Sequence, residues 1–205
     1  MQVLTLDNRT FEEKCRHLAD MVRNGTAARY DAIVAVRRGG SYVCDAFCRF
    51  FPSSGYGDRY DVSLQRPSTK RKNGMLSRIL KRLPLPVLDM MRMAESSILS
   101  LLHRMKADKA TPGVELPEGL RRLLEDTETP EILVVDDAID SGDTLFAIAE
   151  SLRNTNPRLR LRIAVITVTT NNPRIRPDFA LFSNRTLIRF PWSNDFKNQK
   201  KAPHS

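Results

Sequence analysis

The stretch 132–145, which reads ILVVDDAIDSGDTL, constrains the fold of this chain more than any other. Its first four residues are apolar and mostly β-branched, which is typical of a strand buried on both faces in the middle of a parallel sheet. A polar turn follows, and apolar residues then recur with helical spacing over 145–152. Strand, polar turn and helix form the half-unit of an α/β fold, in which ligands bind at the carboxyl ends of the strands.

The polar turn contains two kinds of group. Ser141, Gly142 and Thr144 stand where a helix begins, and free backbone N–H groups, hydroxyls and the helix dipole favour a phosphate there. The adjacent acids Asp136 and Asp137 can instead grip a vicinal diol and stabilise a developing positive charge. The simpler interpretation is an ordinary strand-to-helix turn with chance acids, but the whole order of residue types favours a binding site.

This stretch resembles the motif with which type I phosphoribosyltransferases bind phosphoribosyl pyrophosphate (PRPP): an apolar strand, two acids and a Thr/Ser-Gly-x-Thr loop. The resemblance implies an α/β fold with a central parallel sheet flanked by helices, a small hood from the N- and C-terminal segments, and a helical insertion. It implies that Asp136 and Asp137 face the ribose hydroxyls and contact Mg²⁺, mostly through waters. It also implies a loop for the 5′-phosphate, formed by Asp140, Ser141, Gly142, Asp143 and Thr144.

A second apolar strand is expected over 31–36, and it runs into Arg37, Arg38, Gly39 and Gly40. A helix beginning near residue 41 would place these glycines at another anion site. By itself the pattern also fits a Gly-Gly turn with surface arginines. Together with the first motif it resembles the pyrophosphate loop of the same family, which often contains a non-proline cis peptide. The resemblance therefore implies that these four residues bind pyrophosphate.

Asp140 points to the acceptor. The order Asp-Asp-Ala-Ile-Asp-Ser-Gly is especially close to the hypoxanthine-guanine enzymes, where the corresponding aspartate lies beside purine N7 and acts as acid or base. This implies a purine or purine-like base, with Asp136, Asp137 and Asp140 as the catalytic residues. The implied base-binding residues are Ile139, Thr169, Trp192 and Asp195.

Two positions depart from the purine enzymes. The lysine that bonds the 6-oxo group in those enzymes is replaced here by Thr169 or Thr170, so the charged donor is lost. Asp143 fills a slot that is usually neutral or basic, and it adds negative charge beside a phosphate. Trp192 leaves two alternatives open: it either stacks over the base or fills a small core within the hood.

The net charge of +9 is concentrated between residues 66 and 82, where seven basic residues and no acid occur. Such a patch suits pyrophosphate as well as nucleic acid. The resemblance implies a flexible loop here that closes over the substrates, with Ser68, Thr69, Lys70 and Arg71; a solvated surface loop is the alternative. The insertion is expected to span 67–126, either packed on the sheet or at a dimer interface, or as a basic amphipathic helix on a membrane surface.

The whole chain, 1–205, is thus predicted to be one phosphoribosyltransferase domain, with a C-terminal hood over 170–196 and a disordered tail over 197–205. We expect Mg²⁺-dependent transfer from PRPP to a purine by a homodimer. A cytoplasmic location is expected because the three cysteines form no obvious disulfide framework and no run of 18 apolar residues occurs. Two alternatives remain: a non-catalytic regulator that senses PRPP or a nucleotide and binds nucleic acid, and transfer to an unusual or membrane-associated acceptor.

Overall fold

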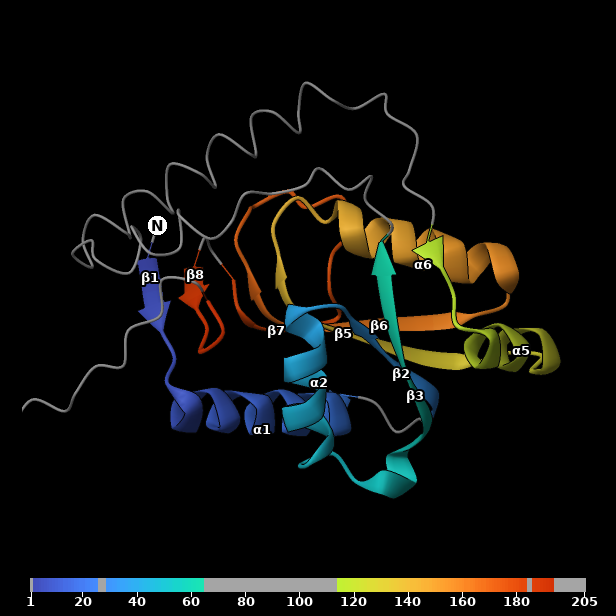
Figure 1. Cartoon of the computed structure of the whole chain (residues 1–205), viewed down its shortest axis with the longest axis horizontal. Helices are drawn as coiled ribbons and strands as arrows, with labels where there is room; N and C mark the ends of the chain where they lie inside the picture. The colour runs from blue at the N-terminus through green and yellow to red at the C-terminus, as the bar shows by residue number, and fades with distance from the viewer. Residues whose placement is uncertain (1, 26–28, 65–113, 184–185, 194–205) are drawn as a thin grey trace, which may run out of the picture.

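The computed structural model describes residues 2–25, 29–64, 114–183 and 186–193, and the statements below concern these residues. A six-stranded sheet with the order β4-β3-β2-β5-β6-β7 forms the centre (Figure 1). Its strands are β2 (Tyr30–Val36), β3 (Tyr56–Leu64), β4 (Val114–Glu115), β5 (Glu131–Ile139), β6 (Arg160–Val168) and β7 (Phe179–Phe182). All neighbours are parallel except β4, which is antiparallel to β3. The predicted α/β fold with a mostly parallel sheet is confirmed.

Helices cover both faces of this sheet. On one face α1 (Asn8–Gly25) and α2 (Gly39–Cys48) pack against it, and α5 (Glu118–Asp126) and α6 (Asp143–Thr155) cover the other (Figure 1). A short 3-10 turn, η1 (Ser53–Gly55), leads into β3. Helix α1 begins at Asn8 because Asp7, whose side chain accepts a hydrogen bond from the Thr10 N–H at 2.8 Å, caps its first turn.

The hood is a separate two-stranded sheet in which β1 (Gln2–Thr5) runs parallel to β8 (Thr186–Arg189). It is tied to the main sheet by the Thr167 hydroxyl on β6, which donates to the Thr186 carbonyl at 2.7 Å. Within the interval 170–196 predicted for the hood, β7 belongs instead to the edge of the main sheet, where it pairs with β6. The chain therefore completes the central sheet before it reaches the hood.

The predicted insertion, 67–126, falls into two parts. Residues 65–113 lie outside the described residues, so the expected loop with Ser68, Thr69, Lys70 and Arg71 lies outside them too. Residues 114–126 form β4 and α5, and Leu120 and Leu124 of α5 are fully buried in the core beneath the sheet. These residues are part of the sheet and its covering helices. No helix in the described ranges is long and apolar enough to span a membrane.

The order of the strands fixes the position of the site. From β2 the chain proceeds to β3 on one side, and from β5 it proceeds to β6 on the other side, so the connections diverge between β2 and β5. Such a switch point leaves a crevice at the carboxyl ends of the two strands, where α/β proteins bind ligands. Both sequence motifs meet there.

Candidate active site

Asp136 and Asp137 lie at the carboxyl end of β5. The strand was expected to end at residue 135, but its pairing with β6 continues to Ile139, so both acids belong to the strand. The two glycines that open α2 lie against them. A Cβ built on Gly39 would lie 1.9 Å from Oδ2 of Asp137, and one on Gly40 would lie 2.8 Å from Oδ1 of Asp136. The two predicted loops are therefore in direct contact.

Ionisation of the two strand-end carboxylates is disfavoured, most of all at Asp136, which is buried, whereas Asp137 is half-buried. Asp136 is 7% exposed, and its Oδ1 accepts the backbone N–H of Asp137 at 2.8 Å. Burial, followed by the nearby charge of Asp137, raises the pKa of the Asp136 carboxyl well above its ordinary value. Burial also raises the pKa of Asp137. Positive charge placed beside this pair would relieve the penalty of ionising both groups.

Two adjacent carboxylates offer the hard oxygen ligands that Mg²⁺ requires. Among the described residues, no group of three or more acidic, histidine or cysteine side chains could hold a metal. Asp136 and Asp137 supply the one or two carboxylates with which proteins usually hold Mg²⁺ beside phosphates, the other ligands being waters and substrate oxygens.

The pyrophosphate loop is shorter than expected. Helix α2 already begins at Gly39 instead of near residue 41, so Gly39 and Gly40 are its first two residues. The Arg37–Arg38 peptide bond is cis, as the family resemblance implies. The Arg37 N–H donates to the Val62 carbonyl at 2.9 Å, which ties the loop to β3. The side chain of Arg37 lines a pocket together with Asp61 and Ser63 of β3.

The predicted 5′-phosphate loop forms the N-terminus of α6. Gly142 has a φ of 83°, a left-handed conformation that favours glycine. A Cβ on this residue would lie 3.0 Å from the backbone nitrogen of Arg174. The Ser141 hydroxyl donates to Oδ2 of Asp143 at 3.0 Å. The side chain of Thr144 is half-buried in the first turn of α6. The turn thus has the backbone shape of an anion site, with an acid at its edge.

Arg174 compensates for that acid. Its Nη1 lies 3.6 Å from Oδ1 of Asp143, and its guanidinium lies 3.8 Å from the centre of the Phe146 ring. Its backbone N–H donates to the Ser141 carbonyl at 2.8 Å. Sequence reasoning missed this residue. The signal available was the acid at position 143, which needs a cation nearby if the site is to accept a phosphate.

Asp140 and Thr169 come together although 28 residues separate them in the chain. The Thr169 hydroxyl lies 2.5 Å from Oδ1 of Asp140, at the adjacent ends of β5 and β6. Asp140 is exposed, whereas Thr169 is buried. Ile139, also predicted to contact the base, is 1% exposed within the core on the α6 face of the sheet.

Trp192 lies in an aromatic cluster under the hood. It stacks on Phe190 with a centroid distance of 4.7 Å and on Tyr42 of α2 at 4.8 Å, and it meets Phe11 of α1 edge-on at 5.0 Å. Trp192 thus packs between the hood and the helices α1 and α2, and its stacking over a base stays a prediction. The cluster includes Tyr42, which sequence reasoning did not single out and which links the pyrophosphate loop to the hood. Asp195 lies outside the described residues.

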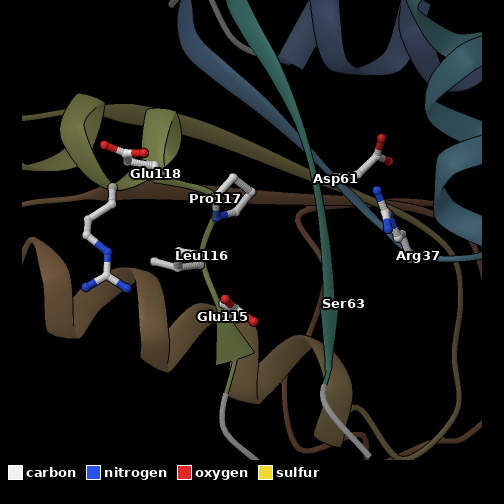
Figure 2. Close-up of a pocket in the computed structure, with 8 residues that line it drawn as sticks. Arg37, Asp61, Ser63, Glu115, Leu116, Pro117 and Glu118 are labelled. Carbon is white, nitrogen blue, oxygen red and sulfur yellow. The ribbon is translucent and has the colours of Figure 1, made fainter.

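A pocket of about 400 Å³ borders the pyrophosphate loop. Figure 2 shows Arg37 and Asp61 on one side of β3 in this view, with Glu115, Pro117 and Glu118 on the other side. Asp61 accepts a hydrogen bond from the Ser41 hydroxyl at 2.6 Å. Arg37 is the one residue of the predicted pyrophosphate loop among those that line this pocket.

Two strand–turn–helix units that meet at the carboxyl ends of neighbouring parallel strands place this chain in the class of α/β proteins that bind ligands at a topological switch point. Residues 5–197 match the family model described as the phosphoribosyl transferase domain. The chain belongs to this family and is a phosphoribosyltransferase. A comparison with curated protein sequences finds no match.

Solved structures with the same fold include purine enzymes. A purine phosphoribosyltransferase from Pyrococcus horikoshii Ot3 is 18% identical with a TM-score of 0.60, over 98% of this chain and 100% of its own. A xanthine-guanine-hypoxanthine phosphoribosyltransferase from Helicobacter pylori is 17% identical, with a TM-score of 0.57 over 94% of each chain. A hypothetical protein from Neisseria gonorrhoeae with bound ppGpp is 15% identical, with a TM-score of 0.56 over 93% of this chain and 89% of its own.

Proposed function

We propose that this protein transfers the phosphoribosyl group of PRPP to a purine or purine-like base, with Mg²⁺, and releases pyrophosphate. Membership of the family supports transfer from PRPP in general. The purine acceptor rests on one observation above all, the exposed carboxylate of Asp140 at the carboxyl edge of the sheet. It stands between the aspartate pair and the turn of Ser141, where a base joined to the ribose would lie.

The chain supplies a group for each part of the reaction. Backbone N–H groups and hydroxyls from Ser141 to Thr144 bind the 5′-phosphate. Asp136 and Asp137 accept hydrogen bonds from the ribose hydroxyls and stabilise the positive charge that develops as the bond from C1′ to pyrophosphate breaks. When bound, Mg²⁺ would neutralise part of the charge on the departing pyrophosphate.

The remaining groups bind the leaving group and the base. Arg37, Arg38 and the N–H groups of Gly39 and Gly40 hold the pyrophosphate as it leaves. As the new bond forms between C1′ and a ring nitrogen, the base loses a proton, and Asp140 accepts it. Each proton and bond is thereby accounted for by residues that meet at the β2–β5 crevice.

The test follows pyrophosphate release from PRPP with Mg²⁺ against a panel of purines and pyrimidines. We expect turnover with at least one purine, and Asp140→Asn should lower kcat about 10²- to 10⁴-fold, the usual contribution of a general base. Asp126→Asn, which changes an exposed acid at the end of α5, is the matched control and should behave as the unchanged protein. Tight PRPP binding without turnover of any base would contradict the proposal.

A second candidate function is a regulator that senses a nucleotide. It is favoured by the similar hypothetical protein from Neisseria gonorrhoeae, whose structure contains bound ppGpp. Titration calorimetry with ppGpp, alone and after saturation with PRPP, tests this candidate. Competitive binding of ppGpp by a protein that shows no turnover would favour the regulator, and a steep salt dependence of polynucleotide binding would add nucleic acid as its partner.

We further infer a cytoplasmic homodimer. The three cysteines are free thiols, which supports a reducing compartment. Light scattering during gel filtration measures the oligomeric state, and a monomeric mass would contradict the dimer. Co-sedimentation with anionic vesicles, which tests the membrane-associated alternative, should leave the protein in the supernatant.

A further inference from the structure

The hydroxyl of Thr169 has a defined partner. Thr169 follows the last residue of β6 and is 6% exposed. Its backbone N–H donates to the Ile139 carbonyl at 2.9 Å, so the end of β6 is fixed against the end of β5. Its hydroxyl oxygen lies 2.5 Å from Oδ1 of Asp140 and 3.3 Å from the Ile139 carbonyl oxygen. A threonine hydroxyl has one proton to donate, and the shorter contact identifies Asp140 as its acceptor.

This bond restrains a side chain that little else holds. Asp140 is exposed, and the Thr169 hydroxyl is the one hydrogen-bond partner of its carboxylate within the described ranges. A hydrogen bond to an ionised oxygen is about twice as strong as a neutral one. With Oδ1 held from the core side, the position of Oδ2 is restricted as well, and this oxygen remains available to a ligand.

We propose that Thr169 is a positioning residue, which holds the Asp140 carboxylate against the reacting base and does not itself read the base. The inference rests on the proposed function, because it assigns Asp140 the proton transfer. It changes the expected role of Thr169, whose proton is given to Asp140 and is therefore not offered to a 6-oxo group. Discrimination between 6-oxo and 6-amino purines then does not depend on this side chain.

Thr169→Val tests the proposal because it keeps the shape of the side chain and removes the hydroxyl. Misplacing a catalytic group by about 1 Å costs on the order of 100-fold in rate. We therefore expect kcat to fall about 10- to 100-fold, with KM for the base changed less than about threefold. The fall should be the same for hypoxanthine and adenine if both are substrates. Thr169→Ser, which retains the hydroxyl, should restore most of the rate.

Two comparisons separate positioning from a structural effect. Thr155→Val removes a hydroxyl that bonds the Ser151 carbonyl at 3.1 Å near the far end of α6, and it should leave kcat unchanged. In an Asp140→Asn background, Thr169→Val should have less than a twofold effect, because it acts through Asp140. A large additional loss in that background would overturn the proposal. So would a tenfold rise in KM for hypoxanthine alone, with kcat unchanged.

A measurement without turnover keeps this inference separate from the proposed function. If the unchanged protein turns over no base, the proposed function fails, and crystal structures of Thr169→Val and Thr169→Ser still decide the positioning role. The Asp140 side chain should move or lose order in the valine variant and keep its place in the serine variant. An Asp140 carboxylate that keeps its place in the valine variant would refute the inference.

Discussion

Replacing Gly40 by alanine tests the contact between α2 and β5 most directly. A Cβ at this position would lie 2.7 Å from the Val135 carbonyl oxygen and 2.9 Å from the Asp136 Cα. Both are backbone atoms of a central strand paired on each side, so neither can move without disturbing the sheet. The helix must instead shift away from the aspartates.

The expected loss of stability follows from two opposing effects. Overpacking of a filled site costs about 1–3 kcal/mol. Alanine is favoured over glycine in a helix by roughly 0.5–1 kcal/mol. A contact shorter than 3.0 Å with backbone belongs to the upper part of the overpacking range, which leaves a net loss of about 1–2 kcal/mol. For a chain of this size, about 2–4 °C per kcal/mol, the melting temperature should fall about 2–8 °C.

Gly119→Ala is the matched control. Gly119 is also the second residue of its helix, α5, but a Cβ there would meet only the ring of Tyr60, at 3.0 Å. Tyr60 is half-buried and its ring can turn aside. The same substitution should therefore raise the melting temperature or leave it unchanged.

Thermal unfolding followed by circular dichroism measures both variants, and titration with PRPP measures the site. Gly40→Ala should weaken PRPP binding because Asp136 and Asp137 are displaced from the pyrophosphate loop, whereas Gly119→Ala should not. The reasoning is refuted if Gly40→Ala melts within 1 °C of the unchanged protein, or if both variants lose the same stability.

Three further predictions concern charge. Without Mg²⁺, the raised pKa of Asp136 makes the folded chain bind more protons than the unfolded chain above about pH 4, so the free energy of unfolding should fall as pH rises through the folded pKa. Urea unfolding from pH 5 to 8 should show that this free energy falls less steeply with pH in Asp136→Asn. An unchanged slope in the variant would contradict the prediction. Arg174→Ala should weaken PRPP binding up to about fivefold, since partly exposed ion pairs contribute up to about 1 kcal/mol, and adding Asp143→Asn should restore it; calorimetry that shows no recovery would exclude the neutralising role. A hydrogen bond with a neighbouring thiol lowers the pKa of Cys48 to about 7, whereas burial raises the pKa of Cys15 to about 12. Mass spectrometry should therefore find that iodoacetamide labels Cys48 first, and the labelling rate should be half-maximal near pH 7. Preferential labelling of Cys15 would contradict the prediction.

Much of the site could be predicted from local sequence. The apolar runs before Asp136 and before Arg37 indicated two buried strands. The glycines that follow each run indicated a helix start. These local signals are strong because hydrophobic period and glycine placement depend on neighbouring residues alone. Element ends were less well predicted, as in β5, which continues through the acids because β6 supplies pairing partners as far as Val168.

Contacts between distant segments could not be predicted in the same way. Nothing in the local pattern of Asp143 indicates Arg174 as its partner, and nothing near Tyr42 indicates a stack with Trp192. Each pair forms because separate elements converge at the carboxyl edge of the sheet or under the hood. From the sequence, Asp143 appeared only to add negative charge beside a phosphate site, whereas in the fold it forms an ion pair with Arg174.

The sequence by itself determined the fold class and the positions of the two strand–turn–helix units, because these depend on strand, turn and helix signals within about 15 residues. The tertiary structure decided which groups act together. It placed the glycines of α2 against the aspartates of β5, and it brought the Thr169 hydroxyl to where it donates a hydrogen bond to Asp140. The physical reason is that parallel strands bring remote residues to one edge of the sheet, where burial and short distances decide which polar groups pair.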